Sequence, residues 1–590
     1  MGKRSTILIL FLFLAAPLSF ILSGLAVWEY AGLNGETPWS AAWLIWQRGS
    51  PQLKTWLLNG SLIFFGLFLM LLLLFLGKWH MRQRRMIYGQ TRLATLRDVR
   101  QAGLLGNSGL FFGYFNGRPL FDATQLHVLL VAESGTGKGV SLIIPNLLLW
   151  NGSVICTDMK GENYRYTSGY RASRGQSCYC FDPFSQDTHC INPLAYFDDE
   201  NPIDHFQRMG YVIYPDNGKA EKIWVSNARQ LFIGLALLLY LEQGRQAVTF
   251  ANIIATHTGL DLDNLDARLQ KLTGNEYLIN SCRQILKNHA GTPDKTRGGF
   301  DAEFRAPLDV FLNPSVAWAT SKNDVPLDKL RKAPITLYLN TTPGNIDRVS
   351  FLMRMILETV NMLHTQEEFR ANPEHRYQLL LLNDEQHNFY GNLPLMGKAA
   401  SFYRSYGIRI FSVYQSVAQI KQDYGNDGAR AYMDNHNIRI HYCPTDLKKA
   451  KEFAAELGET TIFTKSRSTG KGGSHTGTSE APQKREAFLP EELINMLGQT
   501  HGLLFVGSSR PIRFRKAVWY EEKSFKSRQL PPIKLPHTDS RAAEAFLNRT
   551  LTVLIPESPS LDTLSEMVKN GASDEEINKM IDQIILKPTN

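Results

Sequence analysis

The sequence predicts an α/β protein with a mostly parallel sheet, preceded by two membrane-spanning helices. An apolar run at residues 126–131 is followed by a glycine-rich segment and a second apolar stretch, the strand–loop–helix order of a phosphate-binding unit. Two other apolar runs, at residues 7–28 and 56–76, are each long enough to cross about 30 Å of hydrocarbon. Together these observations predict a membrane-anchored nucleotide-binding protein.

Length and composition limit the alternatives. A chain of 590 residues is too long for one hydrophobic core, so we expect several folded units. Six cysteines without a CxxC pair argue against a disulfide scaffold and against a zinc site. The net charge of +9 is explained by membrane orientation and solubility, and it also permits contact with nucleic acid or anionic lipid.

Basic residues flank the two predicted spans. Lys3 and Arg4 precede the first span, and Lys78, Arg82 and Arg84 follow the second, while the loop between the spans has no basic excess. Positive charge stays on the cytoplasmic side, which predicts cytoplasmic N- and C-termini. The first span could also be a cleaved signal peptide, but the second span that follows it favours an anchor.

The glycine-rich segment is predicted to bind the phosphates of a nucleotide. Gly135 and Gly137 allow the backbone to curl so that its N–H groups point at phosphate oxygens, and Lys138 would reach the β- and γ-phosphates. The following helix is expected to be disturbed at Pro145. The predicted nucleotide-binding residues are Ala132, Glu133, Ser134, Gly135, Thr136, Gly137, Lys138, Gly139 and Val140.

Two positions depart from the usual phosphate-loop pattern. Ala132 replaces the usual first glycine, and Gly139 replaces the serine or threonine whose hydroxyl normally binds magnesium. The metal would then depend on water, on Thr136 or Ser141, or on a distant carboxylate.

Two apolar runs end in an aspartate. Asp158 follows the first run, and Asp384 with its neighbour Glu385 follows the second. An acid at the end of a strand beside the phosphate-loop strand would hold Mg²⁺, and a following glutamate can polarise the attacking water. Because only the second run has the adjacent pair, we assign Asp384 to the metal and Glu385 to the water. The alternative is an exposed acidic turn.

A third strand and two arginines complete the candidate site. The run at 408–414 ends in Gln415, which either senses the γ-phosphate or merely ends a strand. Arg404 and Arg409 are candidates for an arginine that reaches the nucleotide of a neighbouring subunit. The other interpretation of each arginine is a surface charge or a salt bridge, and Arg404 is kept as the candidate.

These motifs, in this order, resemble a known family. The chain is similar to the coupling ATPases of type IV secretion and conjugation systems, the TraG/TraD-type coupling proteins, over residues 1–525. The resemblance rests on the two spans and on ordered motifs, which are Ser134-Gly-Thr-Gly-Lys-Gly-Val, Ile144-Pro-Asn-Leu-Leu, Thr157-Asp-Met-Lys-Gly-Glu, Ile191-Asn-Pro-Leu, Asp384-Glu, Tyr406-Gly-Ile-Arg-Ile, Gln415-Ser-Val-Ala-Gln and Tyr424-Gly. Glycine after the loop lysine also occurs in this family.

The resemblance implies a RecA-like motor that binds ATP and Mg²⁺, with an inserted all-α domain and a hexameric assembly at the bacterial inner membrane. The expected domains are an anchor at 1–85, a motor at 86–199 and 326–528, the all-α domain at 200–325 and a tail at 529–590. Expected partners are inner-membrane components of the secretion channel, membrane lipids, and relaxase–DNA complexes or secreted protein effectors, or both.

Two other functions are kept as alternatives. A septal-type DNA translocase would have more spans, a long Pro/Gln-rich linker and a winged-helix domain, and none is visible. A membrane receptor or scaffold that binds nucleotide without turnover would not need both Lys138 and the Asp384–Glu385 pair.

Two further segments have simpler predictions. Residues 465–484 are rich in Gly, Ser and Thr and predict a flexible loop. Residues 540–551 and 561–586 predict short helices in the tail, which either docks an adaptor or packs on the motor.

Overall fold

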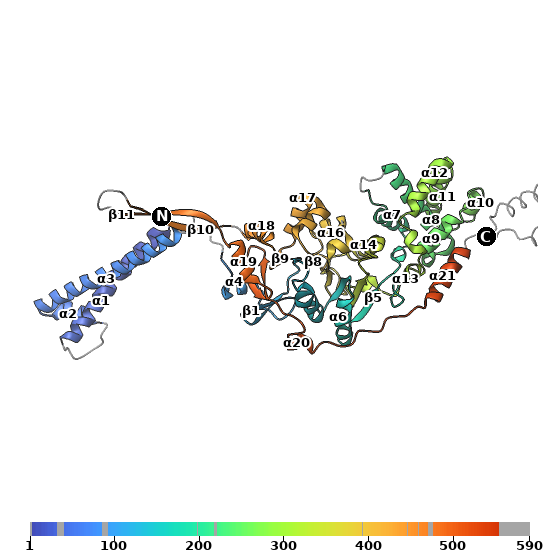
Figure 1. Ribbon diagram of the computed structural model, residues 1–590. Helices are drawn as coiled ribbons and strands as arrows, with labels where there is room; N and C mark the ends of the chain where they lie inside the picture. The colour runs from blue at the N-terminus through green and yellow to red at the C-terminus, as the bar shows by residue number, and fades with distance from the viewer. Residues whose placement is uncertain are drawn as a thin grey trace, which may run out of the picture. The chain divides into compact units, whose positions relative to one another are not determined.

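A computed structural model gives the fold of the chain (Figure 1). It describes residues 3–31, 40–84, 92–197, 199–216, 221–391, 393–444, 446–457, 459–469 and 476–553. The chain divides into two compact units. One comprises Met1–Arg92 and Lys451–Pro490, and the other comprises Leu93–Ala450 and Glu491–Asn590.

The N-terminal helices pack closely on each other in the first unit. These are α1 (Lys3–Tyr30), α2 (Ala41–Arg48) and α3 (Pro51–Arg84). The Ser23 hydroxyl donates to the Leu57 carbonyl at 2.8 Å. A Cβ at Gly60 would collide with that hydroxyl, so the glycine is needed for this approach. Small residues and interhelical hydrogen bonds of this kind hold helix pairs together in membranes.

Two described helices are long and apolar enough to cross a membrane. One is Pro51–Phe75, in which 11% of the apolar window is buried, and the other is Lys222–Gln243, in which 61% is buried. The second is therefore a core helix, as its short apolar run predicted. Leu14–Tyr30 is apolar but shorter in its described part.

The first unit also contains a β-hairpin. Strands β10 (Glu459–Thr469) and β11 (Thr476–Glu486) pair antiparallel, with Thr469 opposite Thr476. The prediction of a flexible loop over 465–484 is therefore wrong for the described residues. Threonine is β-branched and favours extended backbone, and ladder hydrogen bonds do not require an apolar period. Residues 470–475 of the predicted loop lie outside the described residues.

The second unit is built on one mixed sheet. Among the described residues its order is β2-β1-β13-β12-β9-β3-β8-β7-β4-β6-β5. The seven strands from β9 to β5 are parallel, and the other four are antiparallel. The strands are β1 (Leu110–Phe115), β2 (Arg118–Asp122), β3 (Val128–Val131), β4 (Ser153–Asp158), β5 (Ser177–Phe181), β6 (Ile335–Asn340), β7 (Leu379–Asn383), β8 (Ile408–Tyr414), β9 (Ile438–Tyr442), β12 (His501–Val506) and β13 (Ile512–Arg515).

Helices cover both faces of the parallel strands. In β3, Leu129 belongs to one buried cluster, and Val128 and Leu130 belong to the other. Buried parallel strands of this kind read as continuous apolar runs. The helices of this unit outside the β5–β6 connection are α4 (Leu96–Gln101), α5 (Ile144–Leu149), α6 (Glu162–Ser173), α14 (Ile346–His364), α15 (Gln386–Tyr390), α16 (Pro394–Ala399), α17 (Val417–Asn435), α18 (Leu447–Leu457, which continues into the first unit), α19 (Pro490–Leu497), α20 (Lys523–Lys526) and α21 (Ser540–Val553).

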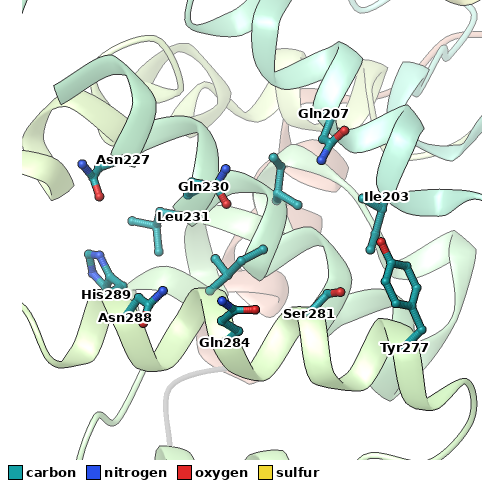
Figure 2. Close-up of a pocket in the computed structure, with 12 residues that line it drawn as sticks. Ile203, Gln207, Asn227, Gln230, Leu231, Tyr277, Ser281, Gln284, Asn288 and His289 are labelled. Atoms are coloured by element: carbon teal, nitrogen blue, oxygen red, sulfur yellow. The ribbon is translucent and has the colours of Figure 1, made fainter. Parts of the chain in front are cut away.

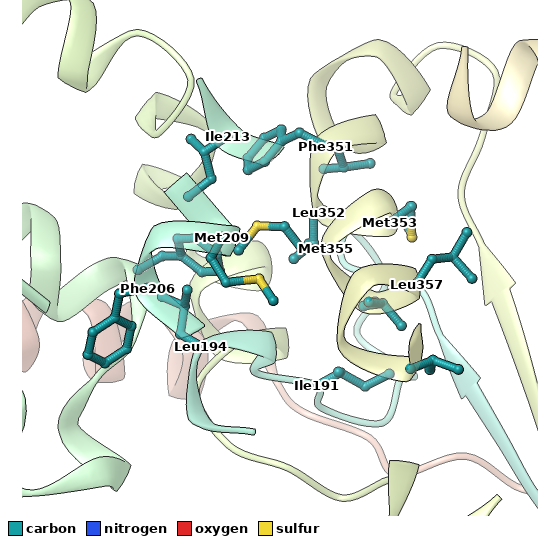
Figure 3. Close-up of a cluster of buried hydrophobic side chains, with 14 of the residues drawn as sticks. Ile191, Leu194, Phe206, Met209, Ile213, Phe351, Leu352, Met353, Met355 and Leu357 are labelled. Carbon is teal, nitrogen blue, oxygen red and sulfur yellow. The ribbon is translucent and has the colours of Figure 1, made fainter. Parts of the chain in front are cut away.

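Among its described residues, the connection between β5 and β6 contains helices and no strand. It contains α7 (Pro202–Ile213), α8 (Lys222–Gln243), α9 (Phe250–Thr258), α10 (Leu265–Gln270), α11 (Glu276–Ala290), α12 (Asp294–Arg305) and α13 (Pro314–Ala319). Its core is continuous with one face of the sheet. Phe206 and Met209 of α7 join the same cluster as Leu352 and Met355 of α14, and Figure 3 shows these side chains facing one another. Its status as a separate domain, with the other boundaries given above, stays a prediction.

The segment after α20 runs along the second unit as an extended strap (residues 528–539). Arg528 donates to the Leu148 carbonyl at 2.9 Å, and the Ile533 N–H donates to the Ser168 hydroxyl at 3.3 Å. The strap leads into α21, where Phe546 meets Trp318 of α13 edge-on at 5.5 Å. The described part of the predicted tail therefore packs on the second unit. The predicted helix at 561–586 lies outside the described residues.

Arg409 is a structural residue. Its side chain is 1% exposed, forms an ion pair with Asp122 and donates to the Leu126 carbonyl at 2.7 Å. The candidate role of Arg409 as an arginine that reaches a neighbouring nucleotide is therefore wrong. The buried pair ties β8 to the end of β2.

We expect Arg409→Met to destabilise the second unit, because Asp122 would be left as a buried, unpaired charge. Breaking one partner of a buried pair typically costs about 3–5 kcal/mol. Thermal unfolding of the full-length protein in detergent should show a clearly lowered midpoint. The matched control is Arg404→Met, which removes a less buried arginine and should leave the midpoint almost unchanged. Equal midpoints for wild type and Arg409→Met would contradict the structural role.

Candidate functional site

The predicted phosphate loop lies between β3 and the following helix, as the sequence indicated. Gly135 has φ +78° and Gly137 has φ +83°, values that side-chain-bearing residues rarely adopt. The Ala132 N–H donates to the Tyr414 carbonyl at 2.9 Å, which ties the start of the loop to the end of β8. The loop therefore has the tight turn that phosphate binding requires.

The helix after the loop begins with a π turn at Gly139–Ile143, and α5 follows directly. The Ile144 N–H donates to the Gly139 carbonyl, five residues earlier. Pro145 has no N–H and would normally interrupt the ladder, as the sequence predicted. Instead the helix continues through Pro145, because the wider turn before it changes the hydrogen-bonding register.

A pocket of about 220 Å³ lies at the loop and gathers most of the predicted site residues. Ala132, Glu133 and Thr136 belong to the loop but do not line the pocket. The lining residues are Ser134, Gly135, Gly137, Lys138, Gly139, Val140, Asp158, Met159, Lys160, Glu162, Asn163, Asp384 and Glu385.

Lys138 and Glu385 meet across this pocket. The Lys138 ammonium lies 3.2 Å from Oε1 of Glu385, although the two residues are 247 positions apart in the chain. Both side chains are largely buried, so the contact is stronger than a surface ion pair. A lysine held here points at the space above the phosphate loop.

Glu385 has a strained backbone. Its φ of +52° places it in the left-handed region, which among the described non-glycine residues is shared only with Asn116. Such a conformation in a residue with a side chain costs on the order of 1 kcal/mol and is found preferentially at functional sites. Here it turns the chain directly after Asp384, so that the Glu385 carboxylate faces Lys138.

Asp384 carries a buried oxygen without a partner. Its Oδ1 is closed off from solvent and has no hydrogen bond among the described residues. Burial raises the pKa of Asp384 to about 7, against the opposing effect of the Lys138 charge. The Thr157 hydroxyl donates to the Asp384 carbonyl at 2.7 Å and fixes the end of β7 against β4.

Asp158 ends β4 beside Asp384 but is already engaged. Its Oδ2 accepts the Tyr164 N–H at 2.8 Å and so caps the first turn of α6. Burial raises the pKa of Asp158 to about 6. Of the two carboxylates, Asp384 is the one with a free oxygen for a cation.

The two nearby hydroxyl groups already donate hydrogen bonds to backbone carbonyls. Thr136 donates to the Glu133 carbonyl at 2.7 Å, and Ser141 donates to the Gly137 carbonyl at 2.6 Å. Neither replaces the hydroxyl that is missing at Gly139. Mg²⁺ is often held by one or two carboxylates together with phosphate oxygens and water, and Asp384 fits that role.

The order of the strands differs from one expectation. The acid-bearing strand β7 is not beside the phosphate-loop strand β3, because β8 lies between them. Gln415 follows β8 and is thus adjacent to the start of the loop, where its N–H is bound by the Gln419 side chain at 2.9 Å. Gln415 does not line the pocket.

Arg404 lies away from the pocket of its own chain. It precedes β8, at the opposite end of that strand from the phosphate loop, and donates to the Asn437 side chain at 3.3 Å. Any contact of Arg404 with a nucleotide would have to involve another subunit, and this role stays a prediction.

Several lining residues had no role assigned from the sequence. Lys160, Glu162 and Asn163 come from the segment after β4, and Lys516 touches the loop from behind. The Thr157–Glu162 motif contains Lys160 and Glu162 without giving their task, and Asn163 directly follows it. The isolated sequence around Lys516 carries no motif that could have indicated it.

A second pocket lies in the helical connection, between α7, α8 and α11 (Figure 2). It measures about 330 Å³, and neutral amide side chains predominate in its lining. No lysine or arginine lines it. These amides are Gln207, Asn227, Gln230, Gln284 and Asn288.

Comparisons with known proteins agree with this geometry. The family model described as "Type IV secretory system Conjugative DNA transfer" matches residues 80–540. Protein VirD4 of Rhizobium radiobacter is 24% identical over 454 residues, which cover 74% of this chain and 65% of the relative. Conjugal transfer protein TraG of Escherichia coli is 24% identical over 506 residues, covering 76% and 79%. The chain thus spans slightly less than two thirds of its VirD4 relatives.

The solved structures include a close match in fold. The structure titled "Plasmid coupling protein TrwB in complex with ADP and Mg2+" has a TM-score of 0.53 at 16% identity, covering 77% of this chain and 97% of that one. This confirms the RecA-like α/β fold with a phosphate loop.

We expect Asp384→Asn to raise the thermal midpoint of the metal-free protein at pH 8 and to raise it by less at pH 5. The folded-state pKa of about 7 is above the usual carboxyl value, so the folded protein bears the desolvation cost when Asp384 is charged above pH 7. That cost disappears as the pH falls towards 4. The gain should be on the order of 1–2 kcal/mol.

The measurement is thermal unfolding of the full-length protein with a chelator present. Asp263→Asn, at an exposed carboxylate, is the matched control and should change neither midpoint. A lowered midpoint for Asp384→Asn at pH 8 would show that the Asp384 charge stabilises the fold instead.

Proposed function

The chain belongs to the type IV secretory system conjugative DNA transfer family, and from this premise we propose that it is a membrane-anchored coupling ATPase of such a system. The observation that carries the proposal is the convergence of Lys138, Asp384 and Glu385 at one phosphate-loop pocket. A scaffold without turnover would need the loop but not an aspartate with a buried, unpartnered oxygen beside a lysine-bound glutamate.

Each residue of the site has a separate role in hydrolysis. The N–H groups of the loop bind the phosphates, and Lys138 leaves Glu385 to neutralise the β- and γ-phosphate oxygens. Glu385, freed from Lys138, accepts a proton from the attacking water as a general base. Bound Mg²⁺, held by Asp384, would neutralise charge that develops on the phosphates. TrwB, in its solved complex with ADP and Mg²⁺, supports both ligands for this chain.

The Lys138–Glu385 pair gives the site a defined resting state. While the two side chains are paired, neither is available for its catalytic task. When nucleotide binds, Lys138 exchanges the Glu385 carboxylate for phosphate oxygens. Glu385 is therefore released to act as the base only when phosphates are present.

The family and the relatives' names support a proposal for the substrate. A conjugal transfer protein and a plasmid coupling protein are among the similar proteins, which favours transfer of DNA bound to a relaxase, of protein effectors, or of both. The second pocket, lined by amides without cations, suits a polypeptide more than a nucleic acid. Inner-membrane channel components are the expected acceptors.

The location and the oligomer are part of the same proposal. The apolar helix Pro51–Phe75 and the basic residues that follow it support a two-span anchor in the bacterial inner membrane, with both termini in the cytoplasm. Six subunits would form a ring, and Arg404 would reach the nucleotide of the neighbouring subunit.

We expect Lys138→Ala and Glu385→Gln to abolish ATP hydrolysis in different ways. Lys138→Ala removes the main phosphate contact, so nucleotide binding should weaken at least about tenfold. Glu385→Gln leaves the phosphate loop unchanged and frees Lys138 from its carboxylate partner. Nucleotide binding should therefore be retained or become tighter. Both effects are measured on full-length protein, by phosphate release and by binding of a fluorescent ATP analogue.

Oligomeric state is measured alongside, because a monomer would lack a trans-acting arginine. Stimulation of wild-type hydrolysis by single-stranded DNA would support a DNA substrate. Nucleotide binding without turnover under every assembly condition would favour the receptor or scaffold.

A further inference from the structure

The segment after β13 contacts the phosphate loop from the side opposite to the pocket. Lys516, the first residue beyond β13, is only 4% exposed. Its ammonium group donates to the Thr136 carbonyl at 2.9 Å and lies 3.9 Å from the centre of the Tyr442 ring. A lysine from the antiparallel part of the sheet is thus bound to the backbone of the loop.

The same ring also supports the neighbouring peptide of the loop. The Tyr442 hydroxyl and the Ser141 hydroxyl are 2.8 Å apart, and Ser141 donates to the Gly137 carbonyl at 2.6 Å. Two consecutive loop carbonyls, those of Thr136 and Gly137, are therefore held by hydrogen bonds. Lys516 and Ser141 hold them, and Tyr442 connects the two.

The geometry of the peptide unit determines where the N–H groups of the loop point. In a trans peptide the C=O of one residue and the N–H of the next point in opposite directions. When Lys516 holds the Thr136 carbonyl outward, the Gly137 N–H is directed towards the pocket. When Ser141 holds the Gly137 carbonyl, the Lys138 N–H is directed in the same way.

A third contact fixes the far end of the loop. The backbone N–H of Trp519 donates to the Val140 carbonyl at 3.0 Å, and the Trp519 side chain is buried beside Ile144 and Leu148. Residues 516–519 therefore hold both sides of the Lys138 position.

The charge of Lys516 is not compensated. Among the described residues it forms no salt bridge, and burial lowers its pKa to about 8. The titratable groups around it are Arg515, Tyr442, Cys443 and His501, and none of them is an acid at neutral pH. A buried ammonium without a carboxylate is unfavourable for folding, so stability alone does not explain this residue.

We propose that Lys516 is a positioning residue for nucleotide phosphates, which orients the N–H groups of the loop and adds positive charge behind them. The inference rests on the proposed nucleotide-binding function. It also assigns a task to a residue outside the loop, at a site where the usual hydroxyl is missing.

The test compares three variants of the full-length protein with wild type, using a fluorescent ADP analogue as the probe. Lys516→Met keeps the length of the side chain but removes the donor and the charge, and we expect affinity to fall about tenfold, which is about 1.4 kcal/mol. Lys516→Arg keeps both the donor and the charge, and its affinity for the ADP analogue should be within about threefold of wild type. Lys526→Met, at an exposed lysine of α20, is the matched control and should bind like wild type.

Two readouts separate positioning from a purely structural role. Without nucleotide, Lys516→Met should unfold at the wild-type temperature or higher, because an unpaired buried charge has been removed. In steady-state hydrolysis its KM for ATP should rise more than its kcat falls. A lowered midpoint of unfolding with unchanged ADP affinity would overturn the proposal.

The pH dependence gives a check that needs no variant. Raising the pH from 7 to 9 removes the Lys516 charge and should weaken ADP binding to wild type, while Lys516→Met should change much less over this range. Equal pH dependence in the two proteins would overturn the proposal. If wild type binds no nucleotide at all, it is the proposed ATPase function that fails.

Discussion

The site depends on the common direction of the central parallel strands. Because β3, β8, β7 and β4 run the same way, the segments that follow them meet at one edge of the sheet, whatever their separation in the sequence. The contact that joins them is the Lys138–Glu385 pair, between the loop after β3 and the turn after β7. Asp384 is positioned by the same constraint, since the Thr157 hydroxyl at the end of β4 binds its carbonyl. The nucleotide-binding pocket at this edge depends on sheet topology more than on any single motif.

Several groups at this edge are held in unfavourable states. Asp384 keeps a buried oxygen without a partner, Glu385 has a left-handed backbone, and Lys516 has a buried charge without a counterion. A nucleotide with its metal would relieve the first and the third of these, because it offers a cation to Asp384 and anions near Lys516. The folded sheet, with its two apolar faces, tolerates these local costs, as is common at functional sites.

Much of this could be predicted from the sequence, because the informative features are local. The glycine loop, the Asp384–Glu385 pair and the apolar helix at Pro51–Phe75 are contiguous runs whose spacing indicates their structure. The sequence did not indicate the position of β8 between β3 and β7, since strand order depends on long-range packing. For Arg409 the sequence left an intersubunit role and a salt bridge both open, because the partner in that salt bridge, Asp122, is 287 residues away. Lys516 was missed for the same reason: its contacts with Thr136 and Tyr442 exist only after the antiparallel strands have closed on the parallel ones.

The most direct test is a structure of the full-length protein with a non-hydrolysable ATP analogue and Mg²⁺. We expect the phosphates in the loop at residues 132–139, the ammonium of Lys138 on the γ-phosphate and no longer on Glu385, and the metal at Asp384. A nucleotide bound elsewhere, or a Lys138–Glu385 pair that persists beside bound nucleotide, would contradict the central claim.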